Sequence, residues 1–124
     1  MVVLAVARVL IGLLFVLTGA LQLVRHGHFT SLFARWHVPA PESAVTLIGA
    51  LELVCGILLA AGVLTRPVAL LLATVMIGAM MTAGRVDGGI YLLVPPVLFV
   101  LCVLLAWRSG RFPGPAPARP PGVQ

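Results

Sequence analysis

The chain has 124 residues and a formal net charge of +5, and 61% of its residues are apolar while only 9% are charged. Soluble globular domains carry roughly a quarter charged residues, so this composition excludes them and predicts an integral membrane protein. Four apolar stretches of about 20 residues each would use most of the chain, which leaves no room for a separate catalytic domain. The basic residues are arginines scattered between apolar runs. They therefore do not form the basic patch that is typical of a nucleic-acid-binding protein.

The first apolar run extends from about residue 2 to residue 24 and is interrupted only by Arg8 and Gln22. It is long enough to cross a hydrocarbon core of about 30 Å as a helix. Thr18 and Ala20 offer a weak cleavage site for a signal peptide, but no basic residue precedes the apolar stretch. We therefore expect a retained membrane span.

The long segment that follows contains aromatic residues at helical spacing. Phe29, Leu32, Phe33 and Trp36 recur at i, i+3, i+4 and i+7, which predicts a short helix with one apolar face. Such a helix is expected to lie in the membrane interface, where Phe and Trp favour the headgroup level. The alternative is that it packs down on the bundle as a lid, and both descriptions can hold together.

The next two apolar runs cover residues 44 to 65 and 67 to 84 and are joined at Arg66. This spacing predicts a tight hairpin of two spans, and Pro67 suits the first helical position because its missing amide has no partner there. Small residues recur along these two runs and along the first run at steps of three and four, and Gln22 shares this face of the first run. We expect those stripes to face protein and to let the helices approach closely.

The fourth run covers residues 89 to 107 and contains Pro95 and Pro96 in its interior. We expect the two prolines to kink this helix and to leave the carbonyls of Tyr91 and Leu92 without helical partners. The predicted fold is thus an all-α integral membrane four-helix bundle over residues 1–108. Residues 109–124, rich in Pro and Gly, are expected to be a disordered tail. The distribution of arginines favours both termini in the cytoplasm.

Glu52 is the acidic residue that lies deep in a predicted span, roughly 12 Å from its outer boundary at 1.5 Å per residue. Ionisable groups inside a membrane mark a functional site or a buried pair. Phe15, Met76 and Pro95 are predicted at a similar depth. Arg8 is the obvious cation for Glu52, although the same count places it about 10 Å closer to the inner face. A direct bridge would need both side chains to be extended, so a water-mediated link and an Arg8 side chain that reaches the inner headgroups are equally open.

Two hypotheses explain the buried carboxyl. In the structural one, a neutral Glu52 donates a hydrogen bond to a carbonyl freed by the prolines of the fourth helix. In the functional one, Glu52 lines a small apolar cavity for a quinone-like or other lipophilic ligand and exchanges a proton with it.

The remaining polar and thiol groups favour simpler interpretations. The three histidines of the long loop have no matching Cys or carboxylate cluster, so we expect them to be solvated and expect no metal. Cys55 and Cys102 both fall inside apolar runs. We expect them to be small core residues rather than a redox pair.

The order of these features resembles the DoxX family of small four-span bacterial membrane proteins. The most specific part of the similarity is the run from Gly49 through Arg66, with Glu52, Gly56 and Gly62. The resemblance covers residues 8 to 108, including Arg8 in the first span. It implies a bundle in the bacterial inner membrane, and it marks Glu52 and Arg66, then Arg8, as the positions of interest.

Some DoxX relatives are membrane subunits of thiosulfate:quinone or detoxifying redox assemblies. The sequence itself offers no flavin, haem or dithiol site, so electron transfer would involve a quinone or a partner's cofactor. The resemblance therefore implies a membrane subunit of a redox or oxidative-stress assembly, with quinone as the candidate cofactor. It does not imply that the chain is an enzyme on its own. Its expected partners are the lipid bilayer, a redox subunit and a second copy of the chain, but no nucleic acid.

Two alternatives stay open. One is a structural or assembly protein without its own chemistry. The other is a small proton-coupled transporter, which is disfavoured because the membrane glutamate of those chains is on the first helix. The candidate ligand-binding residues are Glu52, Arg8, Arg66, Phe15, Met76 and Pro95, with Glu52 as the candidate for proton exchange.

Overall fold

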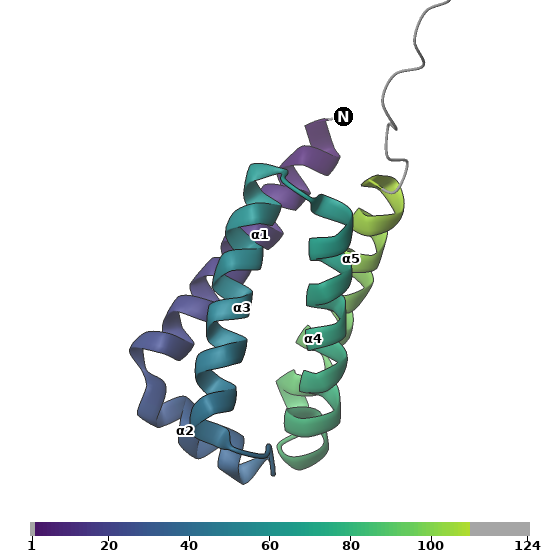
Figure 1. Ribbon diagram of the computed structural model, residues 1–124. Coiled ribbons are helices and arrows are strands. Elements are labelled where there is room, and N and C mark those ends of the chain that lie inside the picture. Colours follow the sequence, from purple (N-terminus) through teal and green to yellow (C-terminus); the bar gives the residue numbers. More distant parts are fainter. Residues whose placement is uncertain (1, 110–124) are drawn as a thin grey trace, which may run out of the picture.

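The computed structural model describes residues 2–109 and contains helices only in that range. The helices are α1 (Val2–Val24), α2 (His26–Arg35), α3 (Pro41–Ala61), α4 (Thr65–Val86), the 3-10 helix η1 (Gly89–Leu92) and α5 (Val94–Ser109). The four long helices form an up-and-down bundle, which confirms the predicted all-α fold (Figure 1). The four segments are long and apolar enough to span a membrane. The predicted tail beyond Ser109 lies outside the described residues.

The two ends of the bundle differ. The start of α1, the turn between α3 and α4 and the end of α5 lie at one end, here named the turn end (Figure 1). The short helix α2 and the 3-10 helix η1 lie at the other, here named the lid end. The α2 segment is helical, as its aromatic spacing predicts.

Helices α1 and α3 pack against each other through two pairs of glycines. A Cβ atom on Gly12 would lie 2.7 Å from the carbonyl oxygen of Gly56, and a Cβ atom on Gly19 would lie 2.6 Å from that of Gly49. Both distances are shorter than van der Waals contact, so only glycine allows the two backbones to approach this closely. The small-residue stripes predicted to face protein therefore do so, and they set the antiparallel register of the two helices.

Helices α4 and α5 form the second pair. Their contact is made by buried apolar side chains, among which Leu72 and Cys102 are fully inaccessible. The two pairs, α1 with α3 and α4 with α5, meet each other along a thinner seam than the contact within either pair. Phe15 and Leu59 belong to the cluster of buried apolar side chains that connects the two pairs.

The turn between α3 and α4 begins earlier than the sequence predicts. Gly62 has the left-handed conformation (φ 78°) and ends α3, and the Val63 amide donates to the Leu58 carbonyl oxygen at 2.9 Å. This is a glycine-terminated helix end that satisfies the last carbonyls of α3. Helix α4 then starts at Thr65, so Pro67 lies in its first turn.

The predicted kink in the fourth span is wrong. Helix α5 starts at Val94, so Pro95 and Pro96 occupy its first turn rather than its interior. Amides in the first turn have no intrahelical acceptor, so proline costs nothing there. The preceding residues form η1, in which the Tyr91 amide donates to the Gly88 carbonyl oxygen at 3.0 Å.

Candidate functional site

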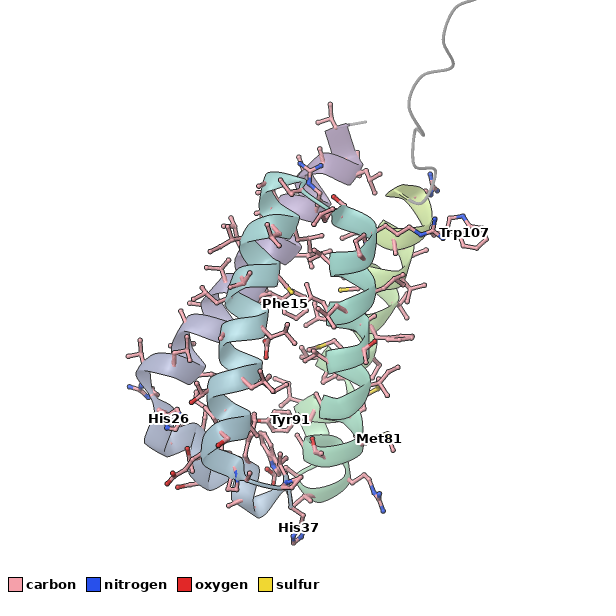
Figure 2. The ribbon with its side chains drawn as sticks, in the orientation of Figure 1. Phe15, His26, His37, Met81, Tyr91 and Trp107 are labelled. Carbon is pink, nitrogen blue, oxygen red and sulfur yellow. The ribbon has the colours of Figure 1, made fainter. Side chains whose placement is uncertain are left out.

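A cavity of about 670 Å³ lies between the two helix pairs, toward the lid end. Its volume falls within the range of about 300 to 1,000 Å³ that is typical of small-molecule sites, and its wall is mostly apolar. Figure 2 shows Phe15 pointing from α1 into the space between the pairs and Tyr91 nearer the lid end. All four long helices, together with α2 and η1, contribute to the wall.

Glu52 forms the polar part of this wall together with two residues of α1. The Thr18 hydroxyl lies 2.8 Å from Oε1 of Glu52, and the Gln22 side-chain amide donates to Oε2 at 2.7 Å. Glu52 is 5% exposed and Gln22 is 7% exposed, so these bonds are shielded from solvent. The carboxyl is therefore held on both oxygens by the neighbouring helix, which fixes its orientation at the cavity.

The contacts of Thr18 allow two arrangements of protons. Its hydroxyl oxygen is 2.8 Å from Glu52 and also 3.1 Å from the carbonyl oxygen of Phe15, but a hydroxyl carries only one proton. If Glu52 is ionised, the hydroxyl donates to the carboxylate. If Glu52 is protonated, the acid can donate to the Thr18 oxygen, and the hydroxyl then donates to Phe15. The same side-chain positions thus accommodate both protonation states.

Gln22 leaves one polar atom unsatisfied. Its Oε1 is buried and has no hydrogen-bond partner, although Gln22 lines the cavity. Buried acceptors are normally paired, so this oxygen is an exception among the buried side chains of residues 2–109.

The structure brings four of the six candidate residues together. Phe15, Glu52, Met76 and Pro95 all line the cavity, as expected from their predicted depth. These residues come from α1, α3, α4 and α5 respectively. Pro95 is in the cavity wall although it does not kink a helix there.

Arg8 and Arg66 lie outside the cavity, at the turn end. The Arg8 guanidinium lies over Gly62, where a Cβ atom would be 3.0 Å from its Cζ atom. Gly62 is about 15 Å from Glu52 along α3 at 1.5 Å per residue, so Arg8 does not pair directly with Glu52. It lies instead at the carboxyl end of α3, where a cation is favourable. Arg66 is in the first turn of α4.

The hydrogen-bond partners of Glu52 differ from those expected. The hypothesis that it bonds to a carbonyl of Tyr91 or Leu92 depended on a proline kink that is absent, and the observed partners are Thr18 and Gln22. Sequence reasoning placed Gln22 on the packed face of α1 but did not pair it with Glu52. The facing glycines of α1 and α3 were the signal that could have shown the register.

Helix α2 and the residues after it close the lid end of the cavity. Phe29, Phe33 and Trp36 line the wall, which supports the lid description of this segment. The Trp36 indole N–H donates to Oδ2 of Asp87 at the end of α4, and the Trp36 ring lies edge-on to Tyr91 with centroids 5.1 Å apart. These contacts tie the lid to the α4–α5 pair.

An ion pair supports the same closure. Arg35 Nη2, in the last turn of α2, lies 2.7 Å from Oδ1 of Asp87. One carboxylate therefore binds both the helix and the indole that follows it. Elsewhere on the lid, His26 Nε2 is 2.9 Å from the Thr46 hydroxyl oxygen of α3. Within residues 2–109, no group of three His, Cys, Asp or Glu side chains is arranged to hold a metal ion.

Comparison with known proteins identifies a protein family. No curated protein and no solved structure matches the chain. The DoxX family model matches residues 3–85, which include α1, α2, α3 and almost all of α4. Helices η1 and α5 lie beyond the matched region. Since the match covers more than half of the sequence and includes Glu52 with both of its hydrogen-bond partners, the chain belongs to the DoxX family.

Proposed function

We propose that this protein is the membrane subunit of a redox or oxidative-stress assembly and binds a quinone-like lipophilic molecule in the cavity beside Glu52. The observation that carries the proposal is a mostly apolar cavity of about 670 Å³ with one polar region, formed by Thr18, Gln22 and Glu52. An apolar wall with a few convergent polar groups is the usual form of a small-molecule site. The proposed location is the bacterial plasma membrane, with both termini in the cytoplasm.

Glu52 has the role of proton exchange in this proposal. Reduction of a quinone to a quinol consumes two electrons and two protons. The alternative proton positions at Thr18 and Glu52 would let the carboxyl release and regain a proton without rearrangement of the cavity wall. The electrons are assigned to a cofactor of a partner protein, so the chain is not an enzyme on its own.

The binding step can be tested by fluorescence. Trp36 lines the cavity, whereas Trp107 is 78% exposed near the opposite end. A Trp107→Phe background therefore isolates Trp36. We expect a short-tailed quinone to quench Trp36 in a saturable manner when the protein is held in lipid nanodiscs. Quenching that rises only linearly with the quinone content of the membrane would contradict the proposed site.

The role of the carboxyl needs a second measurement. Membranes that contain the protein with its native partners are supplied with quinone and with the electron donor of the partner, and quinol formation is followed. Glu52→Gln keeps the shape of the side chain but removes its acidic proton, so we expect quinol formation to fall at least about tenfold. Glu42→Gln is the matched control because Glu42 is exposed in the first turn of α3. Equal rates in the two variants would contradict the role of Glu52.

A structural role is the second candidate function. Both oxygens of Glu52 bond to α1, which is the arrangement expected of a residue that holds two helices together. Under this alternative, Glu52→Gln changes the stability of the bundle but leaves quinone binding and quinol formation unchanged. The two measurements above therefore separate the candidates.

A further inference from the structure

We infer that the ligand of the cavity carries a hydrocarbon tail and that this tail passes into the lipid between α3 and α4, beside Gly78. The inference rests on the proposed function, because it takes the cavity as a binding site. It adds the class of the ligand, which is an amphiphile dissolved in the membrane rather than a solute taken from water. The observation that carries it is the position of Thr74 and Gly78, which line the cavity and are both exposed.

On α4, the residues that line the cavity adjoin the residues that face outward. Exposed side chains outside the cavity wall form one stripe of this helix, namely Leu70, Ile77 and Met81. Thr74 lies four residues after Leu70 and three before Ile77. Gly78 lies three residues before Met81. Residues three and four apart are neighbours on a helix surface, so the cavity wall and the outer surface of α4 meet at this edge.

The facing edge of α3 has the same arrangement. Leu51 lines the cavity, and the exposed residues Leu47 and Val54 lie four positions before it and three after it. Gly49, which packs against α1, is two residues from Leu51 and therefore about 200° from it around the helix. Leu51 thus lies on the side of α3 away from α1, at the seam with α4 (Figure 1). Leu51, Thr74 and Gly78 together border what is here named the side opening.

The polar groups at the side opening are satisfied within α4. The Thr74 hydroxyl donates to the Leu70 carbonyl oxygen at 3.0 Å, and the Thr82 hydroxyl donates to that of Gly78 at 2.8 Å. A Cβ atom on Gly78 would meet nothing within 4 Å, so the space beside this residue is open. Lipid supplies no hydrogen-bond partners, so hydrocarbon can contact a gap between helices only where the polar groups are paired in this way. The side opening therefore suits an alkyl or isoprenoid tail.

The other edges of the cavity are less suitable routes. At the lid end, Arg35 and Trp36 both bind the carboxylate of Asp87, so a ligand from water would have to break an ion pair and a hydrogen bond. On α1, the cavity is lined by Leu14, whose branched side chain stands where the side opening has Gly78. Passage beside the glycine therefore displaces less of the wall.

Variants at adjacent positions of α4 test the route. In the Trp107→Phe background, quenching of Trp36 by a decyl-tailed benzoquinone is followed in nanodiscs by stopped flow. Gly78→Phe fills the side opening, so the wall must move before the quinone enters, and we expect association to slow at least about tenfold. Ile77→Phe is the matched control, because it places a ring on the outward face of the same turn, and it should keep the wild-type rate.

The outcomes separate this inference from the proposed function. Equal association rates in Gly78→Phe and Ile77→Phe would overturn the side opening as the route and leave the cavity as a binding site. If the wild-type protein shows no saturable quenching, the proposed site is overturned as well.

Cross-linking of the unaltered protein decides the question even if Gly78→Phe does not fold. A benzoquinone with a diazirine on its decyl tail is illuminated with the protein in nanodiscs, and the labelled residues are identified by mass spectrometry. We expect labels on Leu51, Thr74 and Gly78 that an excess of the unmodified decyl quinone removes. Such labels on Leu14 or on Phe29 instead would place the tail at another edge of the cavity and overturn the inference.

Discussion

The close approach of α1 and α3 predicts a strong effect of a single methyl group. In Gly19→Ala, the new Cβ atom would lie 2.5 Å from the Leu53 backbone nitrogen and 2.6 Å from the Gly49 carbonyl oxygen. Ordinary contact begins at about 3.4 Å, and backbone atoms cannot rotate away. The helices must therefore separate locally by about 1 Å. Overpacking of this kind costs roughly 1 to 3 kcal/mol.

The same displacement would weaken the bond between Thr18, the preceding residue, and Glu52. A weakened buried hydrogen bond adds about 1 kcal/mol to the cost, while the better helix propensity of alanine returns a similar amount. We therefore expect Gly19→Ala to lower the free energy of unfolding by roughly 1 to 3 kcal/mol. Titration with SDS in mixed micelles, followed by circular dichroism, measures this difference.

Gly78→Ala is the control within the same chain. Gly78 is a glycine in the middle of α4, and a Cβ atom there would meet nothing within 4 Å. The substitution makes the same chemical change without the clash, so its effect should stay within about 0.5 kcal/mol or be stabilising. If Gly19→Ala and Gly78→Ala unfold at the same SDS fraction, the reasoning about the α1–α3 contact is refuted.

Three further predictions concern the lid, the helix turn and the thiols. Asp87→Ala removes the acceptor of the Trp36 indole N–H, so the lid should loosen at a cost of about 1 kcal/mol and the Trp36 emission should shift to the red; unchanged emission would show that the lid does not depend on this bond. Gly62→Ala places a Cβ atom on a residue with φ 78° and should cost about 1 kcal/mol in the same SDS titration; wild-type stability would contradict the strain. Cys55 and Cys102 are 4% and 0% exposed, so a membrane-permeant maleimide should label them only as fast as the bundle opens; labelling at the rate of an exposed thiol would refute their burial.

The helical spans could be predicted from the sequence because few backbone structures are stable inside a membrane. Backbone groups in lipid must be satisfied internally, so a long apolar run becomes a helix whatever its detailed packing. The first span has the predicted ends, Val2 and Val24. Helix ends within the hairpin were harder to place, because Gly62 ends α3 before the apolar pattern does.

The two prolines show where the hydropathy pattern is insufficient. Val94 begins α5, but it lies inside the apolar run that covers residues 89 to 107. Nothing in hydropathy alone distinguishes a proline inside a helix from one in its first turn. The 3-10 helix just before it supplies the missing information, and it depends on Gly88 and Gly89 at positive φ. Glycine adopts positive φ without strain, so this pair of glycines was the sequence signal that could have predicted a break before the helix.

Part of the candidate site could be predicted because the depth of a residue in the membrane can be counted along its helix. The hydrogen-bond partners of Glu52 cannot be found by such a count. The same depth count placed Phe15, Met76 and Pro95 near Glu52. The bond between Gln22 and Glu52 depends on the register of α1 against α3 instead. Side chains lean toward the amino-terminal end of their own helix, so in an antiparallel pair Gln22 and Glu52 lean toward each other. That contact becomes evident only when the glycine pairs have fixed the register.

The spacing of those glycines gives the polar cluster a second consequence. Within each of α1 and α3 the two glycines are seven residues apart, so sliding one helix by seven residues would again bring one glycine of each together. Each slipped alignment keeps one of the two glycine pairs. The slip that pairs Gly12 with Gly49 would move Glu52 two further helical turns away from Thr18 and Gln22 and leave a buried carboxyl without partners. The polar cluster thus disfavours that slip, as a single buried polar residue fixes the register of a coiled coil.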